Sequence, residues 1–266
     1  MQKDTWDPAQ YEKFLHQRSL PFFDLLALVR KRPGMRVIDL GCGTGEWTAR
    51  LHREVGARET LGIDTSEAML AKSGQFAEAA ASGLRFERKD IADWRADGLF
   101  DLVFSNAVLQ FVPNQLALFS RWRSYLAPGG QIAVHIPANQ DYPTHRIALE
   151  LASEEPYRGL LGGYLLPDNR LDLLEYAHLL ERLGFHEQIV RMQVYGHRLP
   201  SREEVVEWVR GSFLNEYKAR LSEAAFERFF ATYRDRLLAV LPDERPFFFT
   251  FKRLLMWAAL PETETA

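Results

Sequence analysis

The residues best suited to bind a ligand lie in one glycine-rich segment, Asp39-Leu40-Gly41-Cys42-Gly43-Thr44-Gly45. Glycines let the backbone turn tightly and bring its N–H groups close to a ligand. The spacing departs from the dinucleotide fingerprint G-x-G-x-x-G, because Glu46 stands where the third glycine is required. No Lys-Ser/Thr pair follows, so the segment is not a phosphate-binding P-loop either.

The position of Asp39 narrows the class of ligand. A carboxylate directly before the glycine loop repels a pyrophosphate, whereas it attracts a ligand that carries an ammonium group. The segment therefore predicts a nucleoside with an amino-acid end and no phosphate, a description that fits S-adenosylmethionine. The alternative is that Asp39 only caps the turn that follows it.

Three further polar positions come at the ends of successive predicted strands. Asp64 can accept hydrogen bonds from both ribose hydroxyls, and Asp90-Ile91 offers an acceptor for an adenine amino group beside an apolar face. Asn106 follows the fourth strand. Each has a structural alternative: Asp64 as a cap of the helix at Ser66, Asn106 as a turn residue, Ile91 as core. The joint arrangement favours a cofactor site.

Short apolar strands and helices alternate around these residues. Expected strands cover residues 36–40, 60–63, 84–88, 100–104 and 131–136, and expected helices cover 46–55, 66–81 and 114–126. An earlier helix is expected to start at Asp7-Pro8 and to be broken or restarted by Pro21. Strands that alternate with helices of this length predict an α/β, doubly wound parallel sheet.

The second half of the chain changes this pattern. After residue 137 come a proline-rich stretch with a helix at 144–153, and then helices at 171–183, 201–213 and 222–241 with strands at 185–195 and 247–260. We expect one structural domain with a cap. Residues 1–136 form the cofactor-binding core with an N-terminal lid helix, and residues 137–266 supply helical cap insertions and the last two strands of the same sheet.

Composition sets wider limits. The chain has 266 residues, a net charge of −3, 47% apolar and 26% charged residues, which excludes a disordered tail, a collagen-like fibre and a basic nucleic-acid coat. One cysteine, Cys42, excludes internal disulfides and a cysteine-rich zinc site, and we expect it to be a small filler of the loop. No signal peptide, membrane span or metal site is expected, and the predicted compartment is the cytoplasm. The oligomeric state stays open, and a monomer fits.

Five motifs resemble the class I S-adenosylmethionine-dependent methyltransferases: DLGCGTG at 39–45, GIDTSEAML at 62–70, Asp90-Ile91, FDLVFSNAVLQF at 100–111 and LAPGGQIAV at 126–134. The resemblance implies a Rossmann-like seven-stranded sheet with an antiparallel last strand, and a helical cap inserted after strand five and between strands six and seven. The expected cofactor-binding residues are Tyr11, Arg18, Asp39, Gly41, Gly43, Gly45, Asp64, Thr65, Met69, Asp90, Ile91, Asn106 and Gln110.

A closer resemblance extends over nearly the whole chain. The segments Trp6-Asp7-Pro8, VLQFVP at 108–113, Pro143-Thr144-His145, Glu207-Trp208-Val209 and Phe251-Lys252-Arg253-Leu254 are similar to the trans-aconitate methyltransferase family, which esterifies a terminal carboxylate of a tricarboxylic acid. The chain departs from that pattern between Ala148 and Leu171 and after Phe213. These segments are expected to shape the acceptor pocket, so the substrate is where the resemblance says least.

The expected chemistry is an in-line displacement on a sulfonium methyl group. A carboxylate acceptor is already ionised near neutral pH, so we expect no catalytic acid or base, only alignment and exclusion of water. The expected partner is a small di- or tricarboxylic acid. Residues that could contact it are Trp6, Phe111, His145, Tyr195 and His197, with Tyr11 and Arg18 on a helix that folds over the cofactor as a lid.

Two other functions remain open from the sequence. One is a methyltransferase for a phenol, an amine or a hydrophobic metabolite, in which His135, His145 or His197 acts as a base. The other is a module that binds the cofactor without turnover. A nucleic-acid partner is not expected, because the balance of charge is slightly acidic and Lys and Arg are dispersed.

Overall fold

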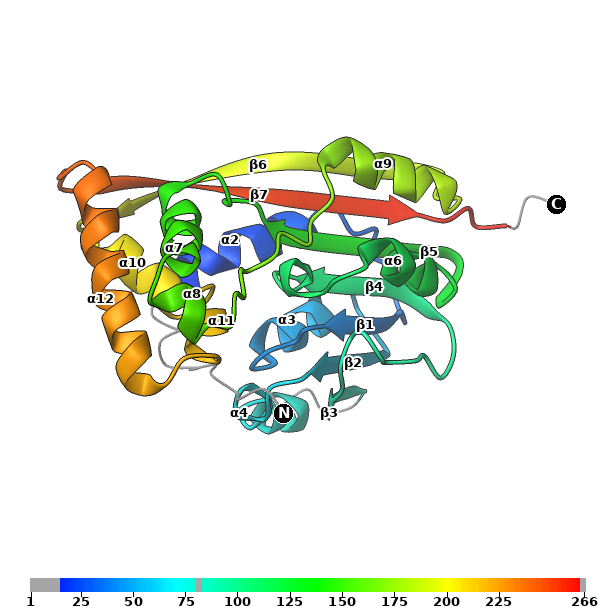
Figure 1. Ribbon diagram of the computed structural model, residues 1–266. Coiled ribbons are helices and arrows are strands. Elements are labelled where there is room, and N and C mark those ends of the chain that lie inside the picture. Colours follow the sequence, from blue (N-terminus) through cyan, green and yellow to red (C-terminus); the bar gives the residue numbers. More distant parts are fainter. Residues whose placement is uncertain (1–14, 80–82, 264–266) are drawn as a thin grey trace. The chain divides into compact units, whose positions relative to one another are not determined.

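A seven-stranded sheet in the order β3-β2-β1-β4-β5-β7-β6 forms the frame of the protein (Figure 1). The structure, a computed structural model, describes residues 15–79 and 83–263. The strands are β1 (Arg36–Leu40), β2 (Glu59–Asp64), β3 (Leu84–Arg88), β4 (Phe100–Asn106), β5 (Leu126–Pro137), β6 (Glu187–Leu199) and β7 (Phe247–Ala259). Strands β1 to β5 pair in parallel, and β7 runs antiparallel to β5. The predicted doubly wound sheet with an antiparallel last strand is confirmed.

The strand order reverses between β1 and β4. From β1 the sheet continues through β2 and β3 on one side and through β4 and β5 on the other. Asp39 of β1 lies opposite Gly62 of β2 and Phe104 of β4, so the carboxyl ends of the three strands are level. In open α/β sheets ligands bind outside the carboxyl ends of the strands at such a switch point. The topology therefore directs a ligand to the segments that follow β1 and β4.

Helices connect the strands, and local capping fixes where several of them begin. Asp172 and Glu175 form a capping box at the start of α9, with each side chain accepting from the other residue's backbone N–H. The helices are α2 (Leu15–Leu26), α3 (Glu46–Glu54), α4 (Glu67–Leu70), α5 (Gly74–Ala79), η1 (Leu109–Phe111), α6 (Gln115–Arg123), α7 (Pro143–Ser153), α8 (Tyr157–Leu160), α9 (Leu173–Arg182), α10 (Glu203–Arg210), α11 (Asn215–Lys218) and α12 (Glu223–Val240).

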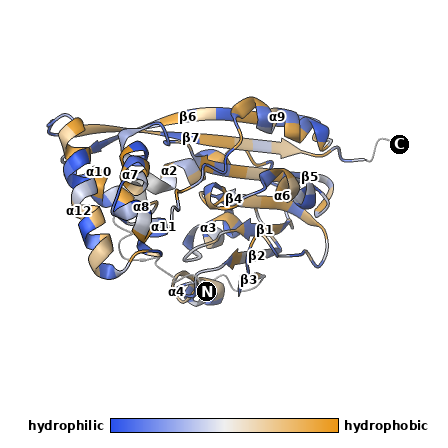
Figure 2. Cartoon of the chain, viewed as in Figure 1, coloured by the Kyte–Doolittle hydropathy of each residue, from blue (hydrophilic) through white to orange (hydrophobic). Residues whose placement is uncertain are grey.

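The chain divides into two compact units. The sheet unit comprises Arg18–Pro137, Asn169–Gln193 and Arg253–Ala266, and the cap unit comprises Met1–Gln17, Ala138–Asp168 and Val194–Lys252. Each has an apolar interior. In the cap unit, buried side chains of α7, α10 and α12 pack with the first half of β7. Figure 2 shows hydrophobic residues concentrated on the central strands β1, β4 and β5, while the helices present hydrophilic and hydrophobic residues together.

The predicted break at Pro21 is wrong, because α2 continues through this residue. Proline removes one backbone hydrogen bond and costs roughly 3 kcal/mol inside a helix. Phe22 and Leu25 in the next turn are fully buried, each contributing roughly 1.5–3 kcal/mol. The ring of Phe22 lies 5.0 Å from Trp47 and 5.7 Å from Phe104, so packing against the sheet outweighs the cost of the proline.

Two other expected boundaries are also wrong. The single helix expected over 66–81 is divided into α4 and α5, where the Ser73 hydroxyl donates to the Leu70 carbonyl at 2.8 Å just before Gly74. A side chain that bonds the backbone in this way competes with the helix. Strand β5 begins at Leu126 instead of residue 131, since Leu126 pairs with Phe100 across an irregularity in the register.

None of the described helices combines the length and the apolar composition that a membrane span requires.

The buried face of α6 generates a prediction about stability. Phe119 is 1% exposed, and its ring lies 5.2 Å from Trp122 and 5.8 Å from Tyr176. We expect Phe119→Ala to lower the free energy of unfolding by about 3–5 kcal/mol, because it leaves a cavity among these rings. Leu116→Ala on the same helix removes a side chain that is 50% exposed and should change it by less than about 0.5 kcal/mol. Urea denaturation measures both, and equal losses would contradict the assignment of α6's buried face.

Candidate active site

The backbone conformation of the loop after β1 requires glycine at three positions. Gly41, Gly43 and Gly45 have φ angles of 84°, 57° and 83°, in the left-handed region that side chains disfavour. A Cβ on Gly41 would lie 2.7 Å from the Cβ of Val108, which follows β4. The glycines therefore allow the β1 loop to approach the segment after β4 at the switch point of the sheet.

The N–H groups of Gly41, Cys42 and Gly43 in this loop already have partners within the protein. Gly41 and Cys42 donate to the Ile63 carbonyl at 2.8 and 3.0 Å, and Gly43 donates to Asp64 Oδ2 at 2.9 Å. A phosphate cradle needs such groups unpaired and directed at the ligand. The loop is thus built for close approach of a ligand that has no phosphate at this point.

Asp39 is a buried carboxyl group directly before the loop. It is 4% exposed and accepts a hydrogen bond from Thr48 Oγ1 at 2.6 Å. Burial raises the pKa of Asp39 to about 7; the Thr48 hydrogen bond opposes this shift, and the negative charge of Asp64 adds to it. A carboxyl group in this environment gains most from a cation, such as the ammonium group of an amino acid.

Cys42, inside the same loop, is not a nucleophile. Its thiol is buried, and burial together with the charges of Asp39 and Asp64 holds the pKa well above its usual range. The expectation that Cys42 fills space in the loop agrees with this environment.

Asp64 joins the β1 loop to the turn after β2. Besides the bond from Gly43, its Oδ1 accepts from the backbone N–H of Ser66 at 2.9 Å. Ser66 caps α4 by accepting from the Met69 N–H at 3.1 Å, and a Cβ on Gly43 would lie 3.3 Å from Met69 Cε. Asp64 therefore does cap this turn, and its carboxylate joins the β1 loop to the start of α4.

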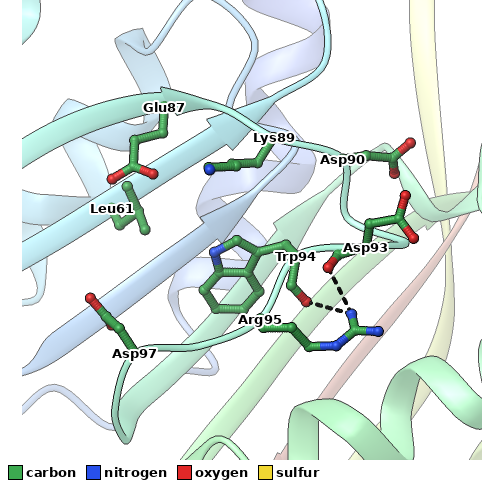
Figure 3. Close-up of a pocket in the computed structure, with 8 residues that line it drawn as sticks. All are labelled: Leu61, Glu87, Lys89, Asp90, Asp93, Trp94, Arg95 and Asp97. Atoms are coloured by element: carbon green, nitrogen blue, oxygen red, sulfur yellow. Dashed lines mark hydrogen bonds between the residues drawn. The ribbon is translucent and has the colours of Figure 1, made fainter.

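Thr65 and Asp90 are exposed, whereas Ile91 is buried. Asp90 Oδ1 accepts from the Ala92 N–H at 2.8 Å. Asp90 is also one of the residues that line an open surface pocket of about 390 Å³ beside β3, shown in Figure 3. The other residues that line the pocket are Leu61, Glu87, Lys89, Asp93, Trp94, Arg95 and Asp97.

The sequence did not single out these other lining residues, and Asp90 is the one predicted site residue among them. Arg95 Nη1 donates to the carbonyls of Asp93 and Trp94, as the dashed lines in Figure 3 show. Four of the lining residues are acids and two are bases, so the lining has a net negative charge that disfavours an anion. It does not suit an acidic acceptor.

The segment after β4 holds Asn106 and Gln110. Asn106 is the last residue of β4, and its Oδ1 lies 2.6 Å from His135 Nδ1. Gln110 Nε2 donates to the Ala107 carbonyl at 2.8 Å. Gln110 Oε1 is buried and has no hydrogen-bond partner within the described residues, so it offers an acceptor to a ligand.

His135 was one candidate base, and its contacts exclude that role. Its Nε2 lies 3.2 Å from Arg253 Nη1, and its Nδ1 faces Asn106. Burial, together with the charge of Arg253, holds the pKa of His135 well below its usual value. Both ring nitrogens are engaged, so His135 has no free lone pair with which to take a proton from an acceptor.

Three of the residues predicted to contact the acceptor belong to the cap unit. The half-buried ring of His145 stacks on Phe213 at 4.3 Å, and Tyr195 is buried. His197 is 4% exposed, with its ring 5.1 Å from that of Trp208. Their contact with an acceptor stays a prediction.

Of the other residues predicted to contact the acceptor or the cofactor, the structure describes the side chain of one and not of the other three. Phe111 is half-buried in η1 of the sheet unit. Trp6 and Tyr11 lie outside the described residues, as does the side chain of Arg18. In the described part of the chain, no three His, Cys, Asp or Glu side chains are placed to hold a metal ion.

The structure thus brings the predicted cofactor residues of the sheet unit to the carboxyl ends of its strands. Asp39, Gly41, Gly43 and Gly45 lie in β1 or follow it, and the N–H of Gly43 donates to Asp64. A residue that the cofactor prediction did not include is His135, which contacts Asn106. The pairing of β4 with β5 that puts the two side by side is a long-range feature, and no local pattern indicates it.

Comparison with known proteins adds a family context. Residues 37–130 match a family described as a methyltransferase domain. The chain is 40% identical over 264 residues to the trans-aconitate 2-methyltransferase of Deinococcus radiodurans, covering 97% of this chain and 99% of that protein. It is 35% identical over 256 residues to a protein of the same name from Streptomyces avermitilis, with 94% and 95% covered.

Solved structures are similar in fold. The YcgJ protein of Bacillus subtilis aligns with a TM-score of 0.61 at 14% identity, over 93% of this chain and all of that one. A phosphoethanolamine N-methyltransferase 2 from Haemonchus contortus, solved with phosphomonomethylethanolamine and S-adenosylhomocysteine, aligns with a TM-score of 0.54 at 18% identity, over 91% of this chain and 52% of that one.

The raised pKa of Asp39 predicts how the stability of the ligand-free protein depends on pH. Between the unfolded value of 3.8 and about 7, the folded state holds a proton that the unfolded state has lost. Stability therefore falls as the pH rises through this window, by about 1.4 kcal/mol per pH unit at most. Asp39→Asn cannot lose a proton and does not show this fall in stability. The free energy of unfolding of Asp39→Asn, relative to that of the wild type, should therefore rise from pH 4 to pH 7 and then stay constant.

Urea denaturation of both proteins at several pH values measures this difference. Asp93→Asn is the control, because water already solvates that exposed carboxylate. An Asp39→Asn advantage that does not change between pH 4 and pH 7 would contradict the raised pKa.

Proposed function

Because the chain belongs to the trans-aconitate 2-methyltransferase family, we propose that it esterifies a carboxylate of a small di- or tricarboxylic acid such as trans-aconitate. The chain is an S-adenosylmethionine-dependent methyltransferase. The choice of acceptor rests on the similarity over nearly the whole chain to relatives named trans-aconitate 2-methyltransferase. The compartment that we propose is the cytoplasm, where a single buried thiol such as Cys42 stays reduced.

The sheet unit contains groups that fit S-adenosylmethionine. We assign Asp39 to its ammonium group, Asp64 to the ribose hydroxyls, and Asp90 with Ile91 to the adenine. The buried carboxyl group of Asp39 supports this assignment, because its desolvated charge is best compensated by a cation. The buried Gln110 Oε1, which has no hydrogen-bond partner among the described residues, supports a polar ligand beside the segment after β4. When bound, S-adenosylmethionine supplies a methyl group that is activated by the positive charge on sulfur.

The protein's own residues then have to bind, orient and exclude water. An ionised carboxylate is already a nucleophile, and aligning it with the methyl group converts a bimolecular reaction into a unimolecular one. No proton has to be removed, which agrees with the exclusion of His135 as a base. We propose that Phe111, His145, Tyr195 and His197 contact the acceptor, together with Trp6, Tyr11 and Arg18.

A phenol or amine acceptor would need a base, and His145 and His197 are the candidates left in the described cap unit. His145 Nδ1 lies 3.0 Å from Thr144 Oγ1, and His197 is enclosed by aromatic rings. A carboxylate acceptor is already ionised, so it needs neither His145 nor His197 as a base.

The assignment of Asp64 predicts cofactor affinity. Asp64→Asn keeps one oxygen that can accept from either Gly43 or Ser66, loses the other of these two bonds, and removes the charge that strengthens the hydrogen bonds from the ribose. We expect the affinity for S-adenosylmethionine, measured by calorimetry, to fall at least about tenfold. Glu67→Gln, an exposed carboxylate of the neighbouring helix α4, is the control and should leave the affinity unchanged. Equal affinities for Asp64→Asn and the wild type would refute this role.

The absence of a base predicts the pH dependence of the reaction. At saturating S-adenosylmethionine, kcat/KM for a carboxylic acid should stay level from about pH 6 to 9, because a carboxyl group with a pKa of about 4 is ionised throughout. A histidine base with a pKa of about 6.5 would instead lower the rate about fourfold at pH 6.

A panel of acids, phenols and amines, with the methylated products weighed by mass spectrometry, provides the comparison. Methyl transfer to phenols or amines alone would refute the carboxylate acceptor. Tight cofactor binding without turnover on any compound would favour a binding module.

A further inference from the structure

Three polar side chains of neighbouring strands form one hydrogen-bonded chain in the sheet unit. Arg253 of β7 places Nη1 3.2 Å from Nε2 of His135 in β5, and His135 Nδ1 lies 2.6 Å from Oδ1 of Asn106 in β4. The strand register holds them together, because Asn106 lies opposite His135, and Arg253 lies opposite Pro137 two residues further along β5. All three side chains therefore lie on the same face of the sheet.

The chain runs from the interior to the ligand end of the sheet. His135 is 1% exposed and Arg253 is 4% exposed, whereas Asn106 is half-buried at the carboxyl end of β4. Buried polar groups usually make hydrogen bonds, and here the buried pair bonds to the more accessible Asn106.

The chemistry of arginine fixes the proton on the histidine. A guanidinium has five N–H donors and no acceptor, so Nε2 of His135 must accept the hydrogen bond from Arg253. A neutral imidazole with an unprotonated Nε2 carries its proton on Nδ1. The burial and the nearby charge that lower the pKa of His135 agree with this neutral form.

The histidine in turn fixes the amide of Asn106. Because Nδ1–H is a donor, the asparagine atom that it meets at 2.6 Å must be the oxygen, as the structure has it. The NH₂ group of Asn106 is left facing the other way, and no described residue accepts a hydrogen bond from it. The half-exposed end of the chain is therefore a pair of N–H donors of fixed orientation.

Hydrogen bonds also fix the backbone of Ala107, the residue after Asn106. Ala107 has a φ of 62°, a left-handed conformation that costs energy for a residue with a side chain. Its N–H donates to the His135 carbonyl at 2.9 Å, and its carbonyl accepts from Gln110 Nε2 at 2.8 Å. His135 thus fixes both the side chain of Asn106 and the turn that follows it.

We propose that Arg253 and His135 are positioning residues that direct the amide nitrogen of Asn106 at a carboxylate bound at the carboxyl ends of β1 and β4. An N–H donor of fixed orientation can bond one oxygen of a carboxylate, a group that only accepts hydrogen bonds. The carboxylate belongs either to the amino-acid end of the cofactor or to the acceptor acid. The second source rests on the proposed function, whereas the arrangement of the three side chains does not.

The first test reads the histidine directly. In protein labelled with ¹⁵N-histidine at pH 7, His135 should show a protonated Nδ1 and an unprotonated Nε2, and these signals should vanish in His135→Asn. A proton on Nε2, or on both nitrogens, would overturn the proposal, whatever the acceptor is.

The second test uses matched variants and calorimetry. Asn106→Asp keeps the oxygen that faces His135 but replaces the NH₂ donors with a charged acceptor, so carboxylate binding should weaken at least about tenfold. His135→Asn keeps a donor at the position of Nδ1 and should bind within about threefold of the wild type. His135→Gln places its amide at the position of Nε2 and loses the donor to Asn106, so it should bind more weakly than His135→Asn but less weakly than Asn106→Asp, which also adds a repelling charge. His178→Gln, on the exposed side of α9, is the control.

Three ligands separate the two sources of the carboxylate. If it belongs to the cofactor, Asn106→Asp weakens S-adenosylhomocysteine but not 5′-methylthioadenosine, which lacks the amino-acid end. If it belongs to the acceptor, both bind normally, and a small tricarboxylic acid binds more weakly to the variant loaded with S-adenosylhomocysteine. Unchanged binding of all three, in variants that keep the wild-type urea midpoint, would overturn the proposal. If the wild-type protein binds no acid at all, the proposed acceptor is refuted. The comparison of S-adenosylhomocysteine with 5′-methylthioadenosine then tests the role of Asn106 by itself.

Discussion

The close approach of the β1 loop to the segments on either side of it is the constraint on which the site depends. Gly41 leaves room for Val108 after β4, and Gly45 leaves room for Phe86 of β3, where a Cβ would come within 2.7 Å in each case. Side chains at these positions would displace the side chains of Val108 and Phe86, and the positive φ angles of Gly41 and Gly45 would add strain. The glycines are therefore required by the packing of the sheet as much as by a ligand, and one set of contacts satisfies both.

A second constraint follows from the first, because the loop that packs so tightly leaves Asp39 out of contact with water. A desolvated carboxyl group costs free energy unless a partner compensates it, and Thr48 supplies only one hydrogen bond. A ligand that brings an ammonium group would lower that cost by binding. The slight negative charge of the whole chain matters less than where this one acid stands.

The sequence predicted the parts of this arrangement that depend on local pattern. Apolar runs that end in a polar residue located β1, β2 and β4, and the glycine spacing identified the loop. The predictions at Pro21 and at the division between α4 and α5 were wrong, because burial of Phe22 and the Ser73 hydroxyl decided those cases. The contact of His135 with Asn106 depends on the pairing of β4, β5 and β7, which no short window of sequence contains.

The same long-range pairing connects the fold with the chemistry. A histidine beside a substrate site usually suggests a base. Here Nε2 accepts a hydrogen bond from Arg253, and Nδ1–H donates one to Asn106. Such a residue can orient its neighbour and cannot accept a proton. An ionised carboxylate needs orientation and no base, whereas a phenol or an amine needs both. A sheet that fixes this histidine as a structural donor therefore suits an acceptor that is ionised before it binds.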